Sequence, residues 1–370
     1  MPFTYAKDTM SALSTLQSLS ASRFETPAIL KKVASASRRL AELKGVASSI
    51  PRQSILINTL SIQEAKDSSE IENIVTTHDE LFQDDLSPKS TLSPAAKVVL
   101  RYRQALGSGY DLVRQTGLLT VSHLLDIQAV LEQNNAGLRK VPGTVLKDGL
   151  GRTIYTPPQD ANEVANLMAD LERFINDSDT FDADPLIKMA LIHHQFESIH
   201  PFYDGNGRTG RILNVLYLVK EGLLDSPVLY LSRYIVRTKA DYYRLLQSVR
   251  TEDTWEEWVL YLLTAVEETA RQAIRTINAI RAALQDYKHR IRATHKFYSQ
   301  DLINNLFTHP YTKIEFVEKD LSVSRLTATR YLEALTAHGF LRKQRIGRYN
   351  YFINPALTHI LTTEPALLAP

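Results

Sequence analysis

The sequence contains no cysteine among its 370 residues. A chain without thiols has no disulfide framework and no thiolate nucleophile. Long apolar runs are also missing, because the longest, around Trp258 to Val266, is too short to span a bilayer. The first residues, MPFTYAKDTM, lack the basic segment and apolar run of a secretion signal. We therefore expect a cytoplasmic protein with no membrane partner.

Neither sign of charge dominates, and the formal net charge is +2. A nearly neutral chain has no global attraction for polyanions, so contact with nucleic acid would require a local basic patch. Hydrophobic residues make up 44% and charged residues 23% of the chain, as in an ordinary globular protein. At this length two or three domains are expected.

Helical periodicity covers most of the chain, and two segments interrupt it. Between Gly137 and Pro158, β-branched residues alternate around Asp148–Gly149, which predicts a β-hairpin with its turn there. The segment from Asp84 to Pro94 is rich in Pro, Ser and Asp and is predicted to be a linker. Helices are predicted over residues 30–41, 54–82, 95–116, 121–133, 161–176, 185–199 and 255–292.

The C-terminal part of the chain has a different pattern. Two short helices are predicted, and after them two short strands that flank Gly347. Two helices followed by a hairpin predict a winged helix-turn-helix unit. The helices are expected at residues 314–321 and 323–338, and the strands at residues 340–345 and 348–353.

Basic side chains cluster in this C-terminal unit. Residues 324–348 contain six of them against a single acid, Glu333. A basic helix and wing fit a duplex groove, so contact with DNA is predicted through Arg325, Arg330 and Arg345. The alternative is a protein-docking or dimerisation unit whose basic face is solvated, and both stay open.

The twelve residues HPFYDGNGRTGR, from His200 to Arg211, combine groups suited to binding a polyphosphate. Glycines let backbone N–H groups converge on an anion, and a helix that begins after the loop adds its dipole. Arg208 and Arg211 can hold phosphate oxygens as planar forks. Asp204 is a hard ligand of the kind that Mg²⁺ accepts. His200, titrating near neutrality, is a natural base for a hydroxyl.

Two other interpretations of this region fit less well. The glycines of the motif also spell GxGxxG, but that dinucleotide fingerprint follows a β-strand, whereas residues 185–199 have a helical pattern. His193 and His194 lack the i, i+4 spacing of a zinc-binding helix. We expect these two histidines to pack between helices.

The whole string matches the motif HxFx(D/E)GNGRxxR at every fixed position. By this motif the chain resembles the Fic/DOC family of protein adenylyltransferases. The resemblance implies a mainly α fold, in which a helical Fic core carries a β-hairpin flap and a C-terminal winged helix-turn-helix follows, as in the bacterial class typified by SoFic. The implied regions are an N-terminal helical region at 1–110, the catalytic core at 111–295 and the winged unit at 296–370.

The resemblance also implies an activity. AMP would pass from ATP, with Mg²⁺, to a Ser, Thr or Tyr hydroxyl of a target protein or of the chain itself. His200 would be the general base and Asp204 the metal ligand. Phosphorylating relatives carry Ala and Lys where this chain has Gly205 and Gly207, which favours adenylyl transfer. The implied ATP-binding residues are Gly205, Asn206, Gly207, Arg208, Thr209, Gly210, Arg211, Tyr242 and Tyr243.

The predicted hairpin, Val145 to Tyr155, corresponds by this resemblance to the flap that docks the target's backbone as an added strand. Val145, Ile154 and Tyr155 are the residues expected to dock it. The alternative is a hairpin with a purely structural role.

Residues 68–73, SSEIEN, resemble the inhibitory motif (S/T)xxxE(G/N) of the same family. They lie on a helix expected over about residues 57–75, where Ser68 and Glu72 are one turn apart. Glu72 paired with Arg211 would withdraw the arginine from the γ-phosphate and place a negative charge there. A surface salt bridge is the usual meaning of such a glutamate and is the alternative.

Rival functions remain at this stage. The basic C-terminal unit is compatible with a DNA-binding transcription regulator in which the core only senses ATP. The same core could move another nucleotide group or remove AMP from its target. A toxin controlled by a separate antitoxin is disfavoured by the in-chain motif. A homodimer formed through the helical core is expected.

Overall fold

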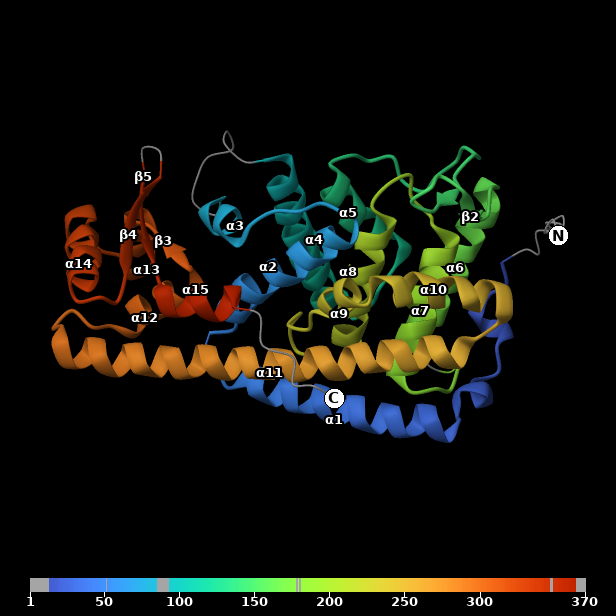
Figure 1. Ribbon diagram of the computed structural model, residues 1–370, viewed down its shortest axis with the longest axis horizontal. Coiled ribbons are helices and arrows are strands. Elements are labelled where there is room, and N and C mark those ends of the chain that lie inside the picture. Colours follow the sequence, from blue (N-terminus) through green and yellow to red (C-terminus); the bar gives the residue numbers. More distant parts are fainter. Residues whose placement is uncertain are drawn as a thin grey trace.

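In the computed structural model, the molecule is built along one helix of 40 residues, α11 (Trp255–Thr294), which follows the longest axis (Figure 1). The structure describes residues 13–363 except 51, 85–92, 178, 180, 347 and 348. Helix α1 (Pro27–Ser48) runs parallel beside α11, and Lys32 and Glu267 join the two by an ion pair of 2.7 Å. The other elements pack on the opposite side of α11.

The motif residues lie on two helices in the middle of this pack. In α7 (Pro185–Ile199) every residue from Leu186 onward is buried, and α8 (Asn206–Lys220) packs against it. Asp184 caps the start of α7 by accepting the N–H of Leu186 at 2.8 Å. Around them lie α4 (Pro94–Thr116), α5 (Val121–Glu132), α6 (Ala161–Asn176), α9 (Leu231–Arg237) and α10 (Lys239–Glu252), and single 3₁₀ turns at Leu16–Ser18 and Ala21–Phe24 precede α1.

The helix that leads to Glu72 ends earlier than the sequence predicts. The structure has α2 at Gln53–Ile71 and α3 at His78–Asp84. The continuous helix expected over residues 54–82 is therefore wrong, and the helix expected over 57–75 ends at Ile71.

Asn73 supplies the physical reason for this early end. Its φ is +61°. Its N–H donates to the carbonyl of Glu70 at 2.9 Å, and the N–H of Ile74 donates to the carbonyl of Ser69 at 3.0 Å. This pair of bonds is a Schellman motif, which favours Gly or Asn at the left-handed position. It leaves Glu72 at the C-cap of α2.

The expected hairpin is present as β1 (Leu146–Lys147) and β2 (Thr153–Tyr155), which pair antiparallel. Its turn forms where the sequence predicts it. The carboxylate of Asp148 accepts the N–H groups of Leu150 and Arg152, both at 2.9 Å. A short polar side chain that bonds to the backbone ahead of it is a typical turn former.

The C-terminal elements follow the predicted order, with two helices before an antiparallel strand pair. The helices are α12 (Gln300–Thr308), α13 (Ile314–Leu321), α14 (Arg325–Ala337) and α15 (Pro355–Thr362), and β3 (Tyr311–Thr312), β4 (Arg342–Ile346) and β5 (Tyr349–Ile353) form a sheet in the order β3-β5-β4. The predicted turn at Gly347 and most of the linker predicted over 84–94 lie outside the described residues.

This C-terminal unit contacts the segment that ends at Glu72. The side chain of Gln63, on α2, donates to the carbonyl of Leu361 at 2.6 Å. The hydroxyl of Tyr311 donates to Asp79 of α3 at 2.5 Å, and the ring of Tyr311 lies 5.7 Å from that of Phe82. Helices α2 and α3 therefore lie between the C-terminal unit and the helices that carry the motif.

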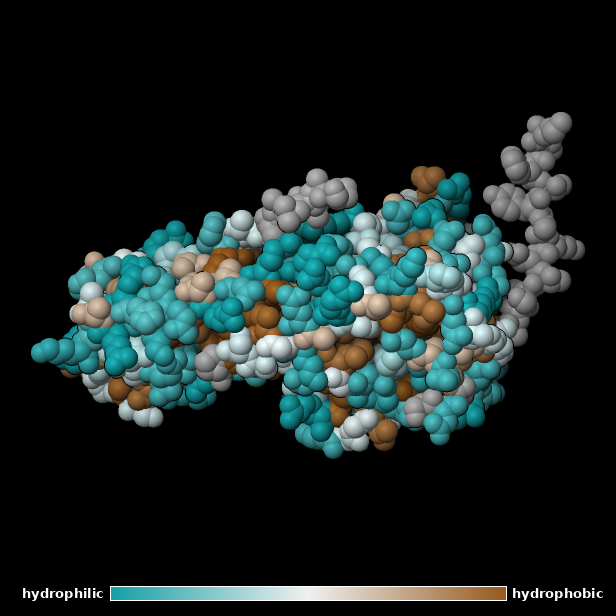
Figure 2. Space-filling view, turned by 90° about the horizontal axis from the view of Figure 1, so that it is seen from below, coloured by the Kyte–Doolittle hydropathy of each residue, from teal (hydrophilic) through white to brown (hydrophobic). Residues whose placement is uncertain are grey.

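The mainly α fold with a small strand pair is confirmed. The expected division at residue 110 falls inside α4, so the N-terminal region and the core share that helix. Among the described residues, none of the helices combines the length and the apolar character needed to cross a lipid bilayer. Figure 2 shows the face seen from below, where hydrophobic side chains gather in several separate patches among hydrophilic ones. The homodimer stays a prediction.

Two glycines of α4 provide a matched test of core packing. A Cβ on Gly109 would lie 2.6 Å from Cδ1 of Leu216 and 2.8 Å from Cδ1 of Ile127, whereas a Cβ on Gly107 would meet nothing within 4 Å. Gly107→Ala should raise the free energy of unfolding by about 0.5–1 kcal/mol, since alanine favours helix. Gly109→Ala should lower it by about 1–2 kcal/mol because the overpacked side chains must move.

Urea denaturation of both variants, followed by circular dichroism, measures the difference. An equal increase in the free energy of unfolding in both variants would contradict the close packing of α4 against α5 and α8.

Candidate functional site

A tight loop joins the end of α7 to the start of α8 and carries the first part of the motif. His200 is the C-cap of α7 with φ 49°, and Gly205 is the N-cap of α8 with φ 80°. Glycine adopts this left-handed conformation at little cost, whereas a histidine there is strained. The loop thus places His200 next to the N-terminus of α8, whose first N–H groups can bind an anion.

Asn206 closes the loop. Its side-chain oxygen accepts the N–H of Phe202, and its amide donates to the carbonyl of Phe202, both at 2.8 Å. The ring of Phe202 is buried 6.1 Å from that of Phe196. The side chain of Asn206 therefore shapes the loop, and its backbone N–H, in the first turn of α8, is the group that faces an anion.

The imidazole of His200 is neutral at neutral pH. Burial lowers the pKa of His200 to about 4, helped by the guanidinium groups of Arg139 and Arg250. The expectation of titration near neutrality is therefore corrected, because the sequence did not reveal how deeply the ring is buried. A neutral imidazole can accept a proton.

Asp204 lies on the open side of the loop. Its side chain is 77% exposed, and one carboxylate oxygen accepts the N–H of Gly205 at 2.7 Å. An exposed carboxylate at the edge of an anion-binding loop suits a divalent cation that also contacts phosphate.

The two motif arginines converge on one carboxylate. Oε2 of Glu72 lies 2.7 Å from Nε of Arg208, and Oε1 lies 2.8 Å from a terminal nitrogen of Arg211. The guanidinium of Arg211 also donates to the hydroxyl of Ser68 at 2.7 Å and to the carbonyl of Ser68 at 2.9 Å. The pairing of Glu72 with Arg211 follows the expectation, and the bond to Arg208 is an addition.

A second carboxylate, Glu132 at the end of α5, also binds Arg208. Its Oε1 lies 2.8 Å from a terminal nitrogen of the Arg208 guanidinium, whereas Glu72 takes Nε. Burial raises the pKa of Glu132, and Asp204 and Glu72 raise it further, against the effect of Arg208. Sequence reasoning did not select Glu132, because it belongs to no motif and lies about seventy residues before the loop.

These two carboxylates lie directly on the glycines of the loop. A Cβ on Gly205 would lie 2.6 Å from Oε1 of Glu132, and one on Gly207 would lie 2.8 Å from Oε1 of Glu72. Glycine is required at both positions because an anion approaches the backbone there. Two anionic groups of the protein therefore occupy the surface on which the sequence predicts phosphates.

The other predicted nucleotide-binding residues divide into accessible and buried ones. Tyr243 is 43% exposed, but Tyr242 is buried, with its hydroxyl 2.9 Å from Nε2 of His193. Thr209 is buried as well. A Cβ on Gly210 would lie 3.0 Å from Cδ1 of Phe196, so the glycine leaves room for that ring. Thr209, Gly210 and Tyr242 thus pack the interior, and Tyr243 lies at the surface.

The flap residues point in different directions. Val145 and Ile154 are exposed, at 38% and 42%. Tyr155 is half-buried and donates its hydroxyl to the carbonyl of Ser198 at 2.9 Å, at the end of α7. Val145 and Ile154 are thus accessible to a target, whereas Tyr155 joins the flap to the end of α7.

The basic residues of the C-terminal unit are partly neutralised. Arg325 forms ion pairs with Glu315 at 2.8 Å and with Glu318 at 3.4 Å. Both acids belong to α13 and precede the range in which the sequence shows a basic excess. Arg330 lies over the ring of Tyr331 at 5.8 Å. Contact with DNA through Arg325, Arg330 and Arg345 remains a prediction.

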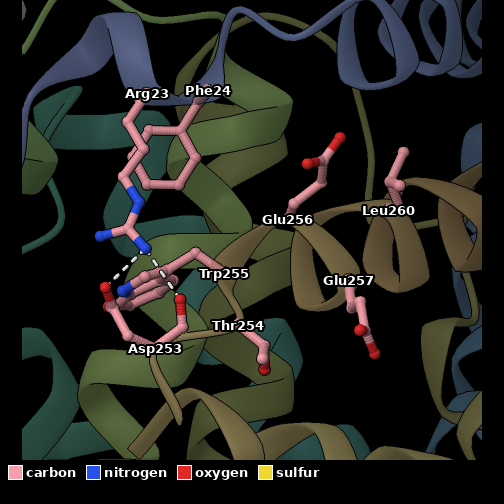
Figure 3. Close-up of a pocket in the computed structure, with 8 residues that line it drawn as sticks. All are labelled: Arg23, Phe24, Asp253, Thr254, Trp255, Glu256, Glu257 and Leu260. Atoms are coloured by element: carbon pink, nitrogen blue, oxygen red, sulfur yellow. Dashed lines mark hydrogen bonds and ion pairs between the residues drawn. The ribbon is translucent and has the colours of Figure 1, made fainter.

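Figure 3 shows a surface pocket elsewhere on the molecule. Arg23 closes one side of it by pairing with Asp253 at 2.7 Å, and Phe24 and Trp255 form its floor. None of the residues that line this pocket belongs to the 200–211 loop or to its bonding partners. We assign the site to the loop because the glycines, arginines and carboxylates converge there.

Three family models match the chain, and together they cover most of it. The Fic/DOC family N-terminal model matches residues 30–111, the Fic/DOC family model matches residues 118–218, and the model of the C-terminal domain of SoFic-like protein adenylyltransferases matches residues 284–357.

Relatives named protein adenylyltransferases match a short part of the chain. Protein adenylyltransferase fic-1 of Caenorhabditis briggsae is 36% identical over 90 residues, which are 24% of this chain and 17% of the relative. A probable protein adenylyltransferase of Aquifex aeolicus is 39% identical over 82 residues, which are 22% of this chain and 24% of the relative. The chain therefore matches less than a quarter of the length of either protein.

Solved structures match over a larger part. A Fic family protein from Desulfovibrio desulfuricans superposes with a TM-score of 0.56 at 22% identity, covering 89% of this chain and 97% of that one. Fic-1 from C. elegans superposes with a TM-score of 0.52 at 21% identity, covering 67% of this chain and 73% of that one. The three family models and this shared fold agree with the loop geometry, and the chain belongs to the Fic/DOC family.

Proposed function

We propose that this chain is a protein adenylyltransferase that transfers AMP from ATP to a hydroxyl group of a target protein or of itself, and that Glu72 holds it inactive. One observation carries the proposal: the carboxylate of Glu72 bridges Arg208 and Arg211 directly over the glycine loop, next to a neutral His200. The names of the relatives and the family membership support the class of reaction.

The reaction requires little covalent chemistry from the protein. His200 takes the proton of the target hydroxyl, whose oxygen then bonds to the α-phosphorus. The bond from that phosphorus to the bridging oxygen breaks, and pyrophosphate leaves. Arg208 and Arg211 hold the phosphate oxygens, and the N–H groups at the start of α8 bind the developing negative charge.

Mg²⁺ fits this site through Asp204. The exposed carboxylate offers one oxygen ligand, and in the described part of the chain no three His, Asp or Glu side chains form a cage of their own. Magnesium is commonly held this way, by one or two carboxylates, phosphate oxygens and waters. When bound, it neutralises phosphate charge.

Glu72 opposes this reaction in two ways. It pairs with both arginine side chains, which are only 5% and 2% exposed. It also places negative charge where the outer phosphates would lie, and in a buried site such repulsion is weakly screened. ATP in the productive position and Glu72 in this position exclude each other.

Removing Glu72 should increase the label that the protein acquires from ATP. The assay uses Mg²⁺ and ATP labelled on the α-phosphate. Glu72→Gly should transfer at least about tenfold more label to protein than the unchanged chain. Glu72 no longer competes with ATP for the arginines, and about 1.4 kcal/mol of binding free energy corresponds to that factor. Glu72→Gly/His200→Ala should transfer none. ATP labelled on the γ-phosphate should leave no label in any variant.

Three outcomes would contradict the proposal. Equal labelling with and without Glu72 would remove the inhibitory role. Label from the γ-phosphate alone would identify a kinase. Binding of ATP without transfer, accompanied by ATP-dependent binding of labelled DNA, would identify a regulator. Glu42→Gln, which breaks an exposed ion pair with Arg39 of 2.8 Å, is the control variant.

Another prediction concerns Glu132, whose carboxylate also pairs with Arg208. In the Glu72→Gly/His200→Ala background, where ATP is not consumed, Glu132→Gln should tighten ATP binding by about tenfold because the negative charge beside Arg208 and Gly205 is removed while the side chain keeps its size. Isothermal titration calorimetry with Mg²⁺ and ATP measures the change. Weaker binding in Glu132→Gln would mean instead that Glu132 holds Arg208 in its phosphate-binding position.

A further inference from the structure

The end of α7, where His200 lies, is capped by side chains from three other segments. The last carbonyls of a helix have no partner within it and must find one elsewhere. The carbonyl of Glu197 accepts from a terminal nitrogen of Arg250 at 3.2 Å. The carbonyl of Ser198 accepts from the hydroxyl of Tyr155 at 2.9 Å.

Arg139 continues this cap beyond the helix. Its side chain donates to the carbonyl of Ile199 at 3.1 Å and to that of His200 at 2.8 Å. Its backbone N–H donates to the carbonyl of Pro201 at 2.8 Å. Every carbonyl from Glu197 to Pro201 therefore has a donor, and all of these donors come from Arg139, Tyr155 and Arg250, which we call the α7 cap.

The cap is joined within itself and to the flap. The guanidinium of Arg250 lies 3.9 Å from the centre of the Tyr155 ring, within range of a cation–π contact. Its Nε donates to the hydroxyl of Ser198 at 3.0 Å. Arg139 also donates to the carbonyl of Pro158, just after β2. The strand β2, which ends at Tyr155, is thus fixed to the helix that ends at His200.

Burying the positive charges of the α7 cap costs free energy unless they interact favourably with other groups. Arg139 is 2% exposed, and among the described residues neither Arg139 nor Arg250 forms an ion pair with a carboxylate. A buried cation without a carboxylate partner loses most of its hydration energy. A cation at the C-terminus of a helix gains from the helix dipole, and here the two charges also act on the imidazole of His200.

We propose that Arg139, Tyr155 and Arg250 are positioning residues for His200, which fix its left-handed backbone and link the base to the flap on which the target docks. This inference rests on the proposed role of His200 as the base. Two effects follow from the geometry. The cap holds a conformation that a histidine does not favour, and its two cations disfavour a proton on the imidazole before the target arrives.

The charged and titratable groups that face His200 come from four segments. Arg139 precedes the flap, Arg250 lies on α10, and Glu72 at the end of α2 acts in the opposite direction. The carbonyl of Glu197, on α7 itself, also favours the protonated ring. Removing Glu72 leaves the two arginines as the charges that decide the protonation of the ring.

The test uses the full chain with Glu72→Gly, to which Tyr155→Phe, Arg250→Gln or Arg250→Lys is added. Two properties are measured as functions of pH: AMP transfer, and the NMR signal of the His200 ring, identified by its loss in His200→Ala. Arg250→Gln removes a positive charge near the ring, so the pKa of His200 should rise by about one unit. The acidic limb of the activity profile should move to higher pH by the same amount.

Two conservative variants distinguish the effect of charge on the His200 pKa from the effect of geometry on kcat. Arg250→Lys keeps the charge, so the His200 signal should titrate as in the parent, while kcat falls about tenfold because the bonds to α7 are lost. Tyr155→Phe removes one hydroxyl and should lower kcat about tenfold without changing the pKa. ATP affinity should stay the same in all three variants, which also shows that they are folded. Arg244→Gln, on the exposed face of α10, is the control.

The outcomes distinguish this inference from the proposed function. An unchanged His200 titration in Arg250→Gln, together with unchanged kcat in Tyr155→Phe, would overturn the positioning role. Full AMP transfer by His200→Ala would overturn the role of His200 as base, and with it the positioning role. If the His200 signal shifts as expected while His200→Ala is inactive, both hold.

Discussion

The contact of one carboxylate, Glu72, with two buried arginines governs the arrangement of the site. Arg208 and Arg211 are 5% and 2% exposed, and each guanidinium needs an anionic partner in place of water. Glu72 can reach both because α2 ends one residue earlier, so its side chain leaves the helix at the C-cap. The Schellman motif at Asn73 creates that end. A Gly or Asn after the glutamate is therefore a geometric requirement of the contact.

The position of Glu72 depends in turn on how α2 is packed. Glu64, buried on the same helix, accepts the hydroxyl of Tyr102 at 3.0 Å and the N–H of Ser232 at 3.1 Å. Burial raises the pKa of Glu64 to about 7 despite these bonds. The C-terminal unit holds the other side of α2 and α3 through Gln63 and Asp79. The helix that carries Glu72 is therefore held both by the core and by the C-terminal unit.

Much of this could be predicted from sequence, and the remainder has identifiable causes. The helices on both sides of the loop and the hairpin follow from local patterns, and the pairing of Glu72 with Arg211 follows from the resemblance to the family's inhibitory motif. The end of α2 could not be predicted because helical periodicity continues past Asn73, and only the folded backbone shows its positive φ and the Schellman bonds. Glu132 and Arg139 were missed because their roles depend on contacts across many residues. The pKa of His200, lowered chiefly by burial, depends on packing that no short motif encodes.

The arginine pair also limits how the site can open. Leaving a buried charge without a partner costs about 3–5 kcal/mol, so a state in which Glu72 has withdrawn and no other anion has arrived is scarcely populated. Phosphate oxygens offer the same charge and hydrogen-bonding geometry as the carboxylate. Under the proposed inhibition by Glu72, activation would be an exchange of one anion for another. Glu132, which also pairs with Arg208, would reduce the charge left unpaired during that exchange.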